Sequence, residues 1–346
     1  METNTKPSEE KQGLFERLKK SKFDGQTVLL LGVFLVLLLF FGIKEDKFLT
    51  ARSITSMGFQ LPEIGVLSIA MMLAILTGGI NLSINATSNL AAVLAGFFLV
   101  KVMPQDVPSD QVVLYLLIAL AITLIVGLVC GVINGYLIGY VGVPPLLATL
   151  ATMTFFTGIS TGLTGGKTVT GFPEQVSLIG TKTLAGIPIP FVVFVVVAAL
   201  TYVILYRTTF GFKVRMMGSN PTAANFSGIH NPSIIMKVYI LSGIFAAIAG
   251  VLVMSRTMSA AIEYGSTTYV LLTILISVLA YIIPGFGSVL NIFIAVLILQ
   301  ILSTGFHMFL LGVRGSSFFK DFSWGILMIL IFVINFFTRG RKSEEA

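Results

Sequence analysis

Long apolar segments separated by short polar ones dominate this sequence and limit what it can fold into. A membrane-spanning helix needs about 20 apolar residues, and a segment surrounded by lipid must satisfy its own backbone hydrogen bonds, which favours helices. We recognise such segments at 27–43, 60–78, 84–102, 112–131, 143–162, 190–206, 233–255, 268–284, 287–305 and 320–338. The boundaries near 78–90 and 280–290 are the least distinct. The sequence therefore predicts an all-α polytopic membrane protein with about ten transmembrane helices.

Basic residues indicate how these helices are oriented. Charged residues make up only 11% of the chain, against about 25% in soluble domains, and Lys and Arg favour the cytoplasmic flanks of spans. Six of them precede position 23 and three lie among the last eight residues. Both termini are therefore predicted to be cytoplasmic. The net charge of +7 is divided among such flanks, so no nucleic-acid partner is expected.

The predicted spans divide the chain into three parts. Residues 1–26 form a cytoplasmic segment in which Leu14, Phe15 and Leu18 stand beside basic residues, so it either lies along membrane lipid or is a solvated tail. Residues 27–338 form one transmembrane domain with a long cytoplasmic loop at 207–232, and residues 339–346 are a cytoplasmic tail.

The stretch GLTGGKT at 162–168 is similar to a phosphate-binding loop but lacks its spacing. That loop requires G-x-x-x-x-G-K-[ST] between a strand and a helix, which would place the first glycine at Thr161. A long apolar segment precedes the stretch instead. We interpret it as an external turn at the end of a membrane helix.

Few side chains in the spans are suited to proton coupling, catalysis or metal binding. Ion-coupled carriers usually hold an ionisable residue deep in the membrane, whereas Glu63 is predicted near the start of the second span and Asp321 at the start of the tenth. His230 and His307 lie in separate segments. No catalytic residue, metal site or cofactor is predicted.

The polar residues inside the predicted spans are uncharged. They suit either a path for a neutral polar solute or hydrogen bonds between helices, and the sequence leaves both open. The candidates for the path are Asn81, Ser83, Asn85, Asn89, Thr149 and Thr152. Glycines at or near helical spacing, among them Gly127, Gly131, Gly243 and Gly250, predict faces where helices approach closely.

The loop from 207 to 232 carries several signals for a short surface helix. Asn220 or Thr222 can cap its start, Gly228 can end it, and Asn231-Pro232 can begin the next span. The loop is either a docking element or a plain connector.

Four stretches in consistent order resemble the ABC-transporter permeases of the ribose, galactose, arabinose and xylose importers, a branch of the branched-chain-type permeases. GSNPTAANFSGI resembles their E-A-A-x-x-x-G motif. TGGINLSINA, GVINGYLIGYVGVPPLLATLATM and KVYILSGIFAAIAGVL resemble three further motifs. The resemblance runs from about residue 55 to 340. The motif's Glu is Thr222 here, and the acid at the third-span entry is Asn81, which puts the usual ATPase contact and the solute in doubt.

The resemblance implies a type II-like ABC importer permease in a bacterial cytoplasmic membrane. Its partners would be ABC ATPase subunits, a second permease chain of the same or another kind, and an extracytoplasmic binding protein that delivers a small polar solute such as a pentose or hexose. The implied ATPase-coupling residues are Arg215, Gly218, Asn220, Pro221, Thr222, Ala223, Ala224, Gly228 and Ile229. Candidates for contact with acids of the binding protein are Lys44, Arg52, Lys182, Arg256 and Arg314.

Other readings of the sequence remain open. An ABC permease for a nucleoside or another non-sugar solute fits the same motifs. An ion-coupled carrier for a small polar metabolite, or an intramembrane enzyme, would need ionisable or catalytic groups that the spans are not predicted to hold.

Overall fold

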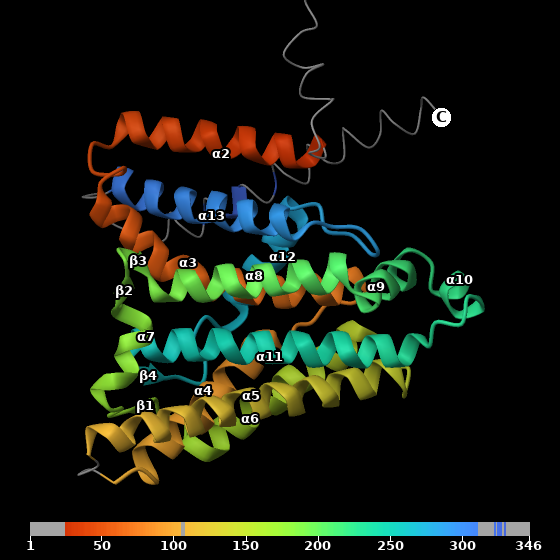
Figure 1. The fold of residues 1–346 in the computed structure, drawn as a ribbon, viewed down its shortest axis with the longest axis horizontal. Helices are drawn as coiled ribbons and strands as arrows, with labels where there is room; N and C mark the ends of the chain where they lie inside the picture. The colour runs from red at the N-terminus through yellow and green to blue at the C-terminus, as the bar shows by residue number, and fades with distance from the viewer. Residues whose placement is uncertain (1–24, 105–107, 311–321, 323, 327–328, 330–346) are drawn as a thin grey trace, which may run out of the picture.

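The computed structural model describes residues 25–104, 108–310, 322, 324–326 and 329 (Figure 1). The predicted N-terminal segment up to residue 24, the C-terminal tail 339–346, Arg314 and most of the predicted tenth span lie outside these residues.

Eight helices of the described chain are long and apolar enough to cross a membrane, which confirms an all-α polytopic membrane protein. They are α2 (Gly25–Lys44), α3 (Ala51–Leu76), α4 (Ile84–Lys101), α5 (Ser109–Gly139), α6 (Pro145–Thr164), α8 (Ile189–Arg207), α11 (Asn231–Thr257) and α13 (Val289–Phe309). The predicted eighth span is the 14-residue helix α12 (Ser266–Leu279). At 1.5 Å per residue, α12 reaches only about 21 Å and is too short to cross the roughly 30 Å hydrocarbon layer alone.

Short elements lie at the two ends of the helix bundle (Figure 1). At one end are α9 (Thr209–Ser219) and α10 (Pro221–Phe226), together with the start of α2. At the other end are the 3-10 helix Glu174–Val176, α7 (Ser177–Thr181), and two antiparallel strand pairs: β1 (Val169–Thr170) with β4 (Ser259–Ala260), and β2 (Thr183–Leu184) with β3 (Ile187–Pro188). The start of α2 therefore shares an end with the 207–232 loop, as the predicted topology requires.

Helix α11 is central and packs along α5, α3 and α4. Glycines make its crossing with α5 possible, because a Cβ built on Gly243 would lie 2.2 Å from the carbonyl oxygen of Gly127. A Cβ on Gly131 would lie 2.6 Å from the carbonyl oxygen of Tyr239. The predicted close approach of helices at these glycines is confirmed.

Helix α3 corrects one prediction about depth. It begins at Ala51, where the Thr50 hydroxyl caps it by accepting from the Ser53 N–H, rather than at 60. Glu63 therefore lies in the middle of a 26-residue helix and is 1% exposed, not near its start. The sequence did not predict the early start of α3, because residues 51–59 are polar enough to be interpreted as a loop.

The stretch GLTGGKT ends a helix, as predicted. Helix α6 stops at Thr164, and Gly165 and Gly166 follow with φ of 62° and 80°, values that glycine adopts easily. The chain then enters β1 rather than a helix, so the geometry of a phosphate-binding loop is absent here.

Candidate functional site

Two helix pairs are joined by largely non-helical backbone, one segment lying inside the bundle and the other returning into it from β4 at one end. Residues 77–83 join α3 to α4, and residues 258–265 join α11 to α12. Non-helical backbone at membrane depth is tolerated where it is buried in protein or lines a cavity. Both segments therefore need internal hydrogen-bond partners.

Two asparagines of α4 supply those partners to the second segment. The Asn85 amide donates to the carbonyl oxygens of Tyr264 and Ser266 at 2.9 and 3.0 Å. The Asn89 amide donates to those of Ile262 and Tyr264 at 2.9 and 3.1 Å. The two amides lie one helical turn apart, so they fix the backbone of residues 262–266 against α4.

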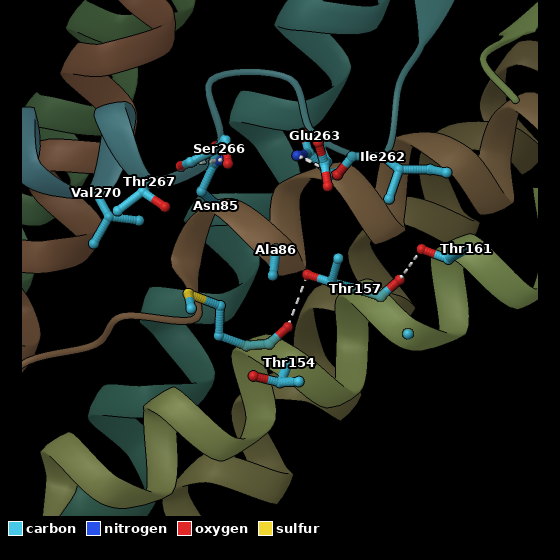
Figure 2. A pocket seen from close by; sticks show the side chains of 13 residues that line it. Asn85, Ala86, Thr154, Thr157, Thr161, Ile262, Glu263, Ser266, Thr267 and Val270 are labelled. Atoms are coloured by element: carbon cyan, nitrogen blue, oxygen red, sulfur yellow. Dashed lines mark hydrogen bonds between the residues drawn. The ribbon is translucent and has the colours of Figure 1, made fainter. Parts of the chain in front are cut away.

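A cavity of about 490 Å³ lies between α4, α6 and this fixed segment (Figure 2). Asn85 and Asn89 line it, and their amides are committed to backbone carbonyls, while their predicted role in a solute path stays a prediction. The other lining residues are Ala86, Met153, Thr154, Thr157, Gly158, Thr161, Ile262, Glu263, Ser266, Thr267 and Val270.

Three threonines form the α6 wall of this cavity. Thr154, Thr157 and Thr161 are three and four residues apart and so share one helix face. Their hydroxyls donate to the carbonyl oxygens of Leu150, Met153 and Thr157 at 3.2, 2.8 and 2.9 Å. The sequence prediction missed this wall as a site, although the threonine spacing was a usable signal.

A second cavity of about 460 Å³ adjoins the first toward the end of α6. It is lined by Thr161, Gly166, Thr168, Ala261, Ile262, Glu263 and Tyr264. Thr161, Ile262 and Glu263 line both cavities. These three residues, which we call the junction, therefore lie where the two cavities meet.

An ion pair between half-buried Arg256 and buried Glu63 holds the fixed segment from its other side. Arg256 Nε donates to a Glu63 carboxylate oxygen, and Arg256 Nη2 donates to the Tyr264 hydroxyl at 2.7 Å. The Tyr269 hydroxyl lies 3.4 Å from the other Glu63 oxygen. Arg256 is thus engaged inside the protein, which corrects its predicted role in contacting a binding protein. It also means that a carboxylate does lie deep in the bundle, contrary to prediction, although a guanidinium neutralises it.

The remaining path candidates form a buried hydrogen-bond chain instead. The Asn134 amide donates to Ser83 Oγ at 2.8 Å, and the Thr152 hydroxyl donates to Asn134 Oδ1 at 2.6 Å. Asn81 joins Ser83 to Ser242 of α11, and Thr149 donates to the Ile80 carbonyl. Asn81, Ser83, Thr149 and Thr152 are each at most 4% exposed and line neither cavity. Their placement favours the alternative of hydrogen bonds between helices over a path for a solute.

The Asn89 contacts make a testable prediction. Replacing Asn89 with Ala leaves the half-buried carbonyl oxygen of Ile262 without its donor, which costs about 1–3 kcal/mol, while the Tyr264 carbonyl keeps its bond from Asn85. We expect hydrogen–deuterium exchange of the peptide covering residues 258–268 to accelerate by about 10- to 100-fold. Asn225→Ala, at an exposed residue of α10, serves as a control and leaves that peptide's exchange unchanged. Equal exchange in both variants contradicts the assignment.

The 207–232 loop contains two helices where one was predicted. The Asn220 side chain caps α10 by accepting from the Ala223 N–H at 3.0 Å, and Gly228 follows its end with a φ of 79°. His230 caps α11, whose first turn contains Pro232. The predicted caps are confirmed, while α9 went unpredicted because its glycines and Thr-Thr start read as loop.

Only part of the predicted coupling set faces outward. Pro221, Thr222 and Ala223 are exposed, while Ala224 and Ile229 are buried. Arg215 donates to the Gly287 carbonyl at 3.0 Å and stacks on Tyr206. A Cβ on Gly218 would meet the Leu76 carbonyl oxygen at 2.0 Å. Arg215 and Gly218 therefore hold α9 on the bundle, which corrects their predicted direct contact with a partner. Phe226, which the prediction omitted, is 89% exposed at the end of α10.

The basic residues predicted to meet a binding protein lie at the opposite end. Lys44, Arg52 and Lys182 are exposed and lie at or next to the ends of α2, α3 and α7 far from α10 (Figure 1).

Comparison with known proteins identifies the family. Residues 53–334 match the family described as branched-chain amino acid transport system / permease component. The chain is 33% identical over 325 residues to the ribose import permease protein RbsC of Bacillus subtilis, covering 92% of this chain and 95% of that protein. It is 32% identical over 301 residues to the autoinducer 2 import system permease protein LsrD of Yersinia enterocolitica, covering 85% and 86%. No solved structure matches. The chain therefore belongs to the permease family of the branched-chain amino acid transport systems and is a multi-pass membrane protein.

Proposed function

We propose that this chain is the membrane-spanning subunit of an ATP-driven ABC importer. With a second permease chain it forms the path for a small neutral sugar, which a soluble binding protein delivers at the end that carries Lys44, Arg52 and Lys182. A separate ATPase docks at α10 and hydrolyses ATP, and the permease itself carries out no catalysis.

Helix α10 is the observation that carries this proposal. It is a six-residue helix with defined caps at both ends, held outside the bundle by the Asn231 amide, which donates to the Pro221 carbonyl at 2.9 Å. Its Phe226 is 89% exposed, and a large apolar side chain so exposed at the aqueous end of a membrane protein suits a protein interface. Since α9 packs directly on α3 through Gly218, movement of α10 has a rigid route to the spans.

The face of α6 supports a path between two permease chains. Ala151, Thr154, Phe155, Gly158 and Gly162 are exposed along one side of this helix, and Thr154 and Gly158 also line the first cavity. Small and polar residues at this spacing suit close approach of another helix. The cavity is therefore open on the side where a second chain would complete it.

The chemistry of the cavity suits a sugar. Its hydroxyl and carboxylate oxygens can accept hydrogen bonds, and ribose, the solute in the name of one relative, is a small neutral molecule rich in O–H donors. An ion-coupled carrier is less well supported, because the buried carboxylate of Glu63 is already paired with Arg256.

Co-purification tests the importer directly. The tagged protein is extracted from its native membranes in mild detergent, and the chains that accompany it are identified. We expect an ABC ATPase at a near-equal or half molar amount, and a second permease chain if the pair is a heterodimer. Its reproducible absence from intact, folded protein would reject the proposal and favour a self-sufficient carrier.

Phe226→Ala tests the docking helix. Loss of a buried aromatic anchor at an interface typically costs 2 kcal/mol or more, so we expect about 30-fold weaker retention of the ATPase with the permease still folded. Phe309→Ala is the matched control, because Phe309 is 50% exposed and ends α13 at the opposite end of the bundle. Unchanged ATPase retention in Phe226→Ala would place the interface elsewhere.

A further inference from the structure

Glu263 is an exposed acid on the fixed segment that lines both cavities. Figure 2 shows it on the segment opposite Thr157 and Thr161 of α6. It is exposed, and within the described residues its carboxylate forms no ion pair. It lines both cavities, of about 490 and 460 Å³. A negative charge therefore lies at the junction itself.

The backbone that carries Glu263 is held on two sides. Asn85 and Asn89 bind its carbonyl groups from α4. The side chain of the next residue, Tyr264, points the other way and accepts a hydrogen bond from Arg256, which is itself paired with Glu63. The positive charge of Arg256 is thus paired with the Glu63 carboxylate and does not neutralise Glu263. These contacts hold the backbone on either side of Glu263, so they fix where its side chain leaves the segment.

The threonine hydroxyls of α6 that line the cavities with Glu263 can act as acceptors. The hydroxyl protons of Thr154, Thr157 and Thr161 go to carbonyl oxygens of their own helix, so the lone pairs of these oxygens remain for a solute. An ionised carboxylate accepts hydrogen bonds only. The wall at the junction therefore offers hydrogen-bond acceptors and one negative charge, a combination that suits O–H donors and repels anions.

We propose that Glu263 is a specificity-determining residue that makes the junction favour neutral polyhydroxylated solutes and exclude anionic ones. This inference rests on the proposed import function, because it assumes that the two cavities lie on the solute path. A cleft lined by charge of one sign changes the local concentration of charged solutes by 10-fold or more. Phosphorylated or carboxylated sugars would thus be rejected at the junction even if they entered one of the two cavities.

Thiol labelling measures this selectivity without knowledge of the natural solute. Cys130 is the only cysteine in the chain, so Cys130→Ala combined with Thr161→Cys leaves one reporter thiol at the junction. The full-length protein is treated with a cationic reagent, methanethiosulfonate ethyltrimethylammonium, or an anionic one, methanethiosulfonate ethylsulfonate. Each rate is divided by that of the same reagent with free 2-mercaptoethanol.

We expect the normalised cation-to-anion rate ratio to be about 10 or higher, and to fall about 10-fold when Glu263→Gln is added. Glu174→Gln is the matched control, since Glu174 is an exposed acid at the same end that lines neither cavity, and it leaves the ratio unchanged. A ratio that Glu263→Gln does not alter overturns the proposal. A Thr161→Cys thiol that reacts with neither reagent in folded protein, yet reacts after unfolding, also overturns it, because the junction is then closed to water.

The labelling result is independent of the ATPase. A Glu263-dependent ratio in protein that brings down no ATPase would reject the importer while supporting the charge selectivity of the junction. If the ATPase co-purifies but the ratio does not depend on Glu263, the importer is supported and the charge selectivity of the junction is rejected.

Discussion

Replacing Arg256 with Met is expected to lower the stability of this protein by about 3 kcal/mol, the lower end of the cost of breaking a buried ion pair, because Glu63 is buried but the Arg256 side chain is 28% exposed. Glu63 is 1% exposed and Arg256 is its partner. Met fills similar volume but supplies no charge or donor, so the buried carboxylate of Glu63 loses its ion pair and keeps only the Tyr264 and Tyr269 hydroxyls, each 3.4 Å away. In detergent, we expect the apparent melting temperature measured by size-exclusion chromatography to fall by about 10 °C.

Two comparisons isolate the ion pair from the loss of a long side chain. Arg52→Met removes a basic residue that is exposed near the start of the same helix as Glu63, where a charge contributes at most about 1 kcal/mol. The double variant Glu63→Gln with Arg256→Met removes both charges, and it should recover most of the lost stability. The single variant Glu63→Gln is measured as well. If the double variant loses as much stability as Glu63→Gln and Arg256→Met added together, the ion pair is not the cause.

Replacing Gly243 with Ala is expected to be the most damaging single-methyl change in the central helix. The added Cβ would lie 2.2 Å from the carbonyl oxygen of Gly127, a backbone atom that no side-chain rotation can move away. Overpacking of this kind costs about 1–3 kcal/mol or more, since α5 must separate from α11 along its length. Folded protein recovered from detergent extracts should fall several-fold.

Gly32→Ala is the matched change, and it should raise the stability of the protein rather than lower it. Gly32 lies in α2, and a Cβ there would meet nothing within 4 Å, so Ala gains up to about 1 kcal/mol of helix propensity. Equal behaviour of the Gly32→Ala and Gly243→Ala proteins would show that α5 and α11 do not pack as described.

Much of the secondary structure follows from the sequence because its causes are local. Long apolar segments become helices, Asn220 and Pro145 begin helices, and Gly165 and Gly228 follow helix ends. Where local signals were weak the prediction failed. The first two turns of α3 are polar, and α9 contains two glycines, so neither stretch reads as helix until its tertiary packing is known.

The site was predicted less well, because polar residues of the same type have different roles in the structure. Asn81 and Asn85 are four residues apart and equally buried, yet Asn81 joins helices and Asn85 borders a cavity. Thr157, which was not among the path candidates, lines that cavity, whereas the candidate Thr152 is bound to Asn134. Helix periodicity predicts which of these residues share a helix face, but not whether that face packs against another helix or borders a cavity.

The sequence by itself determined the class of protein, the approximate helices, their caps and the glycine faces, because hydrophobic length, backbone propensity and residue size act within a few turns of one helix. Only the tertiary structure decided that Glu63 meets Arg256 across 193 positions, that Asn89 binds the backbone at Ile262, and that Glu263 faces Thr161 across two adjoining cavities. These contacts join elements far apart in the chain. Their formation depends on how whole helices cross, and that is set by the sum of many packing contacts rather than by any local pattern.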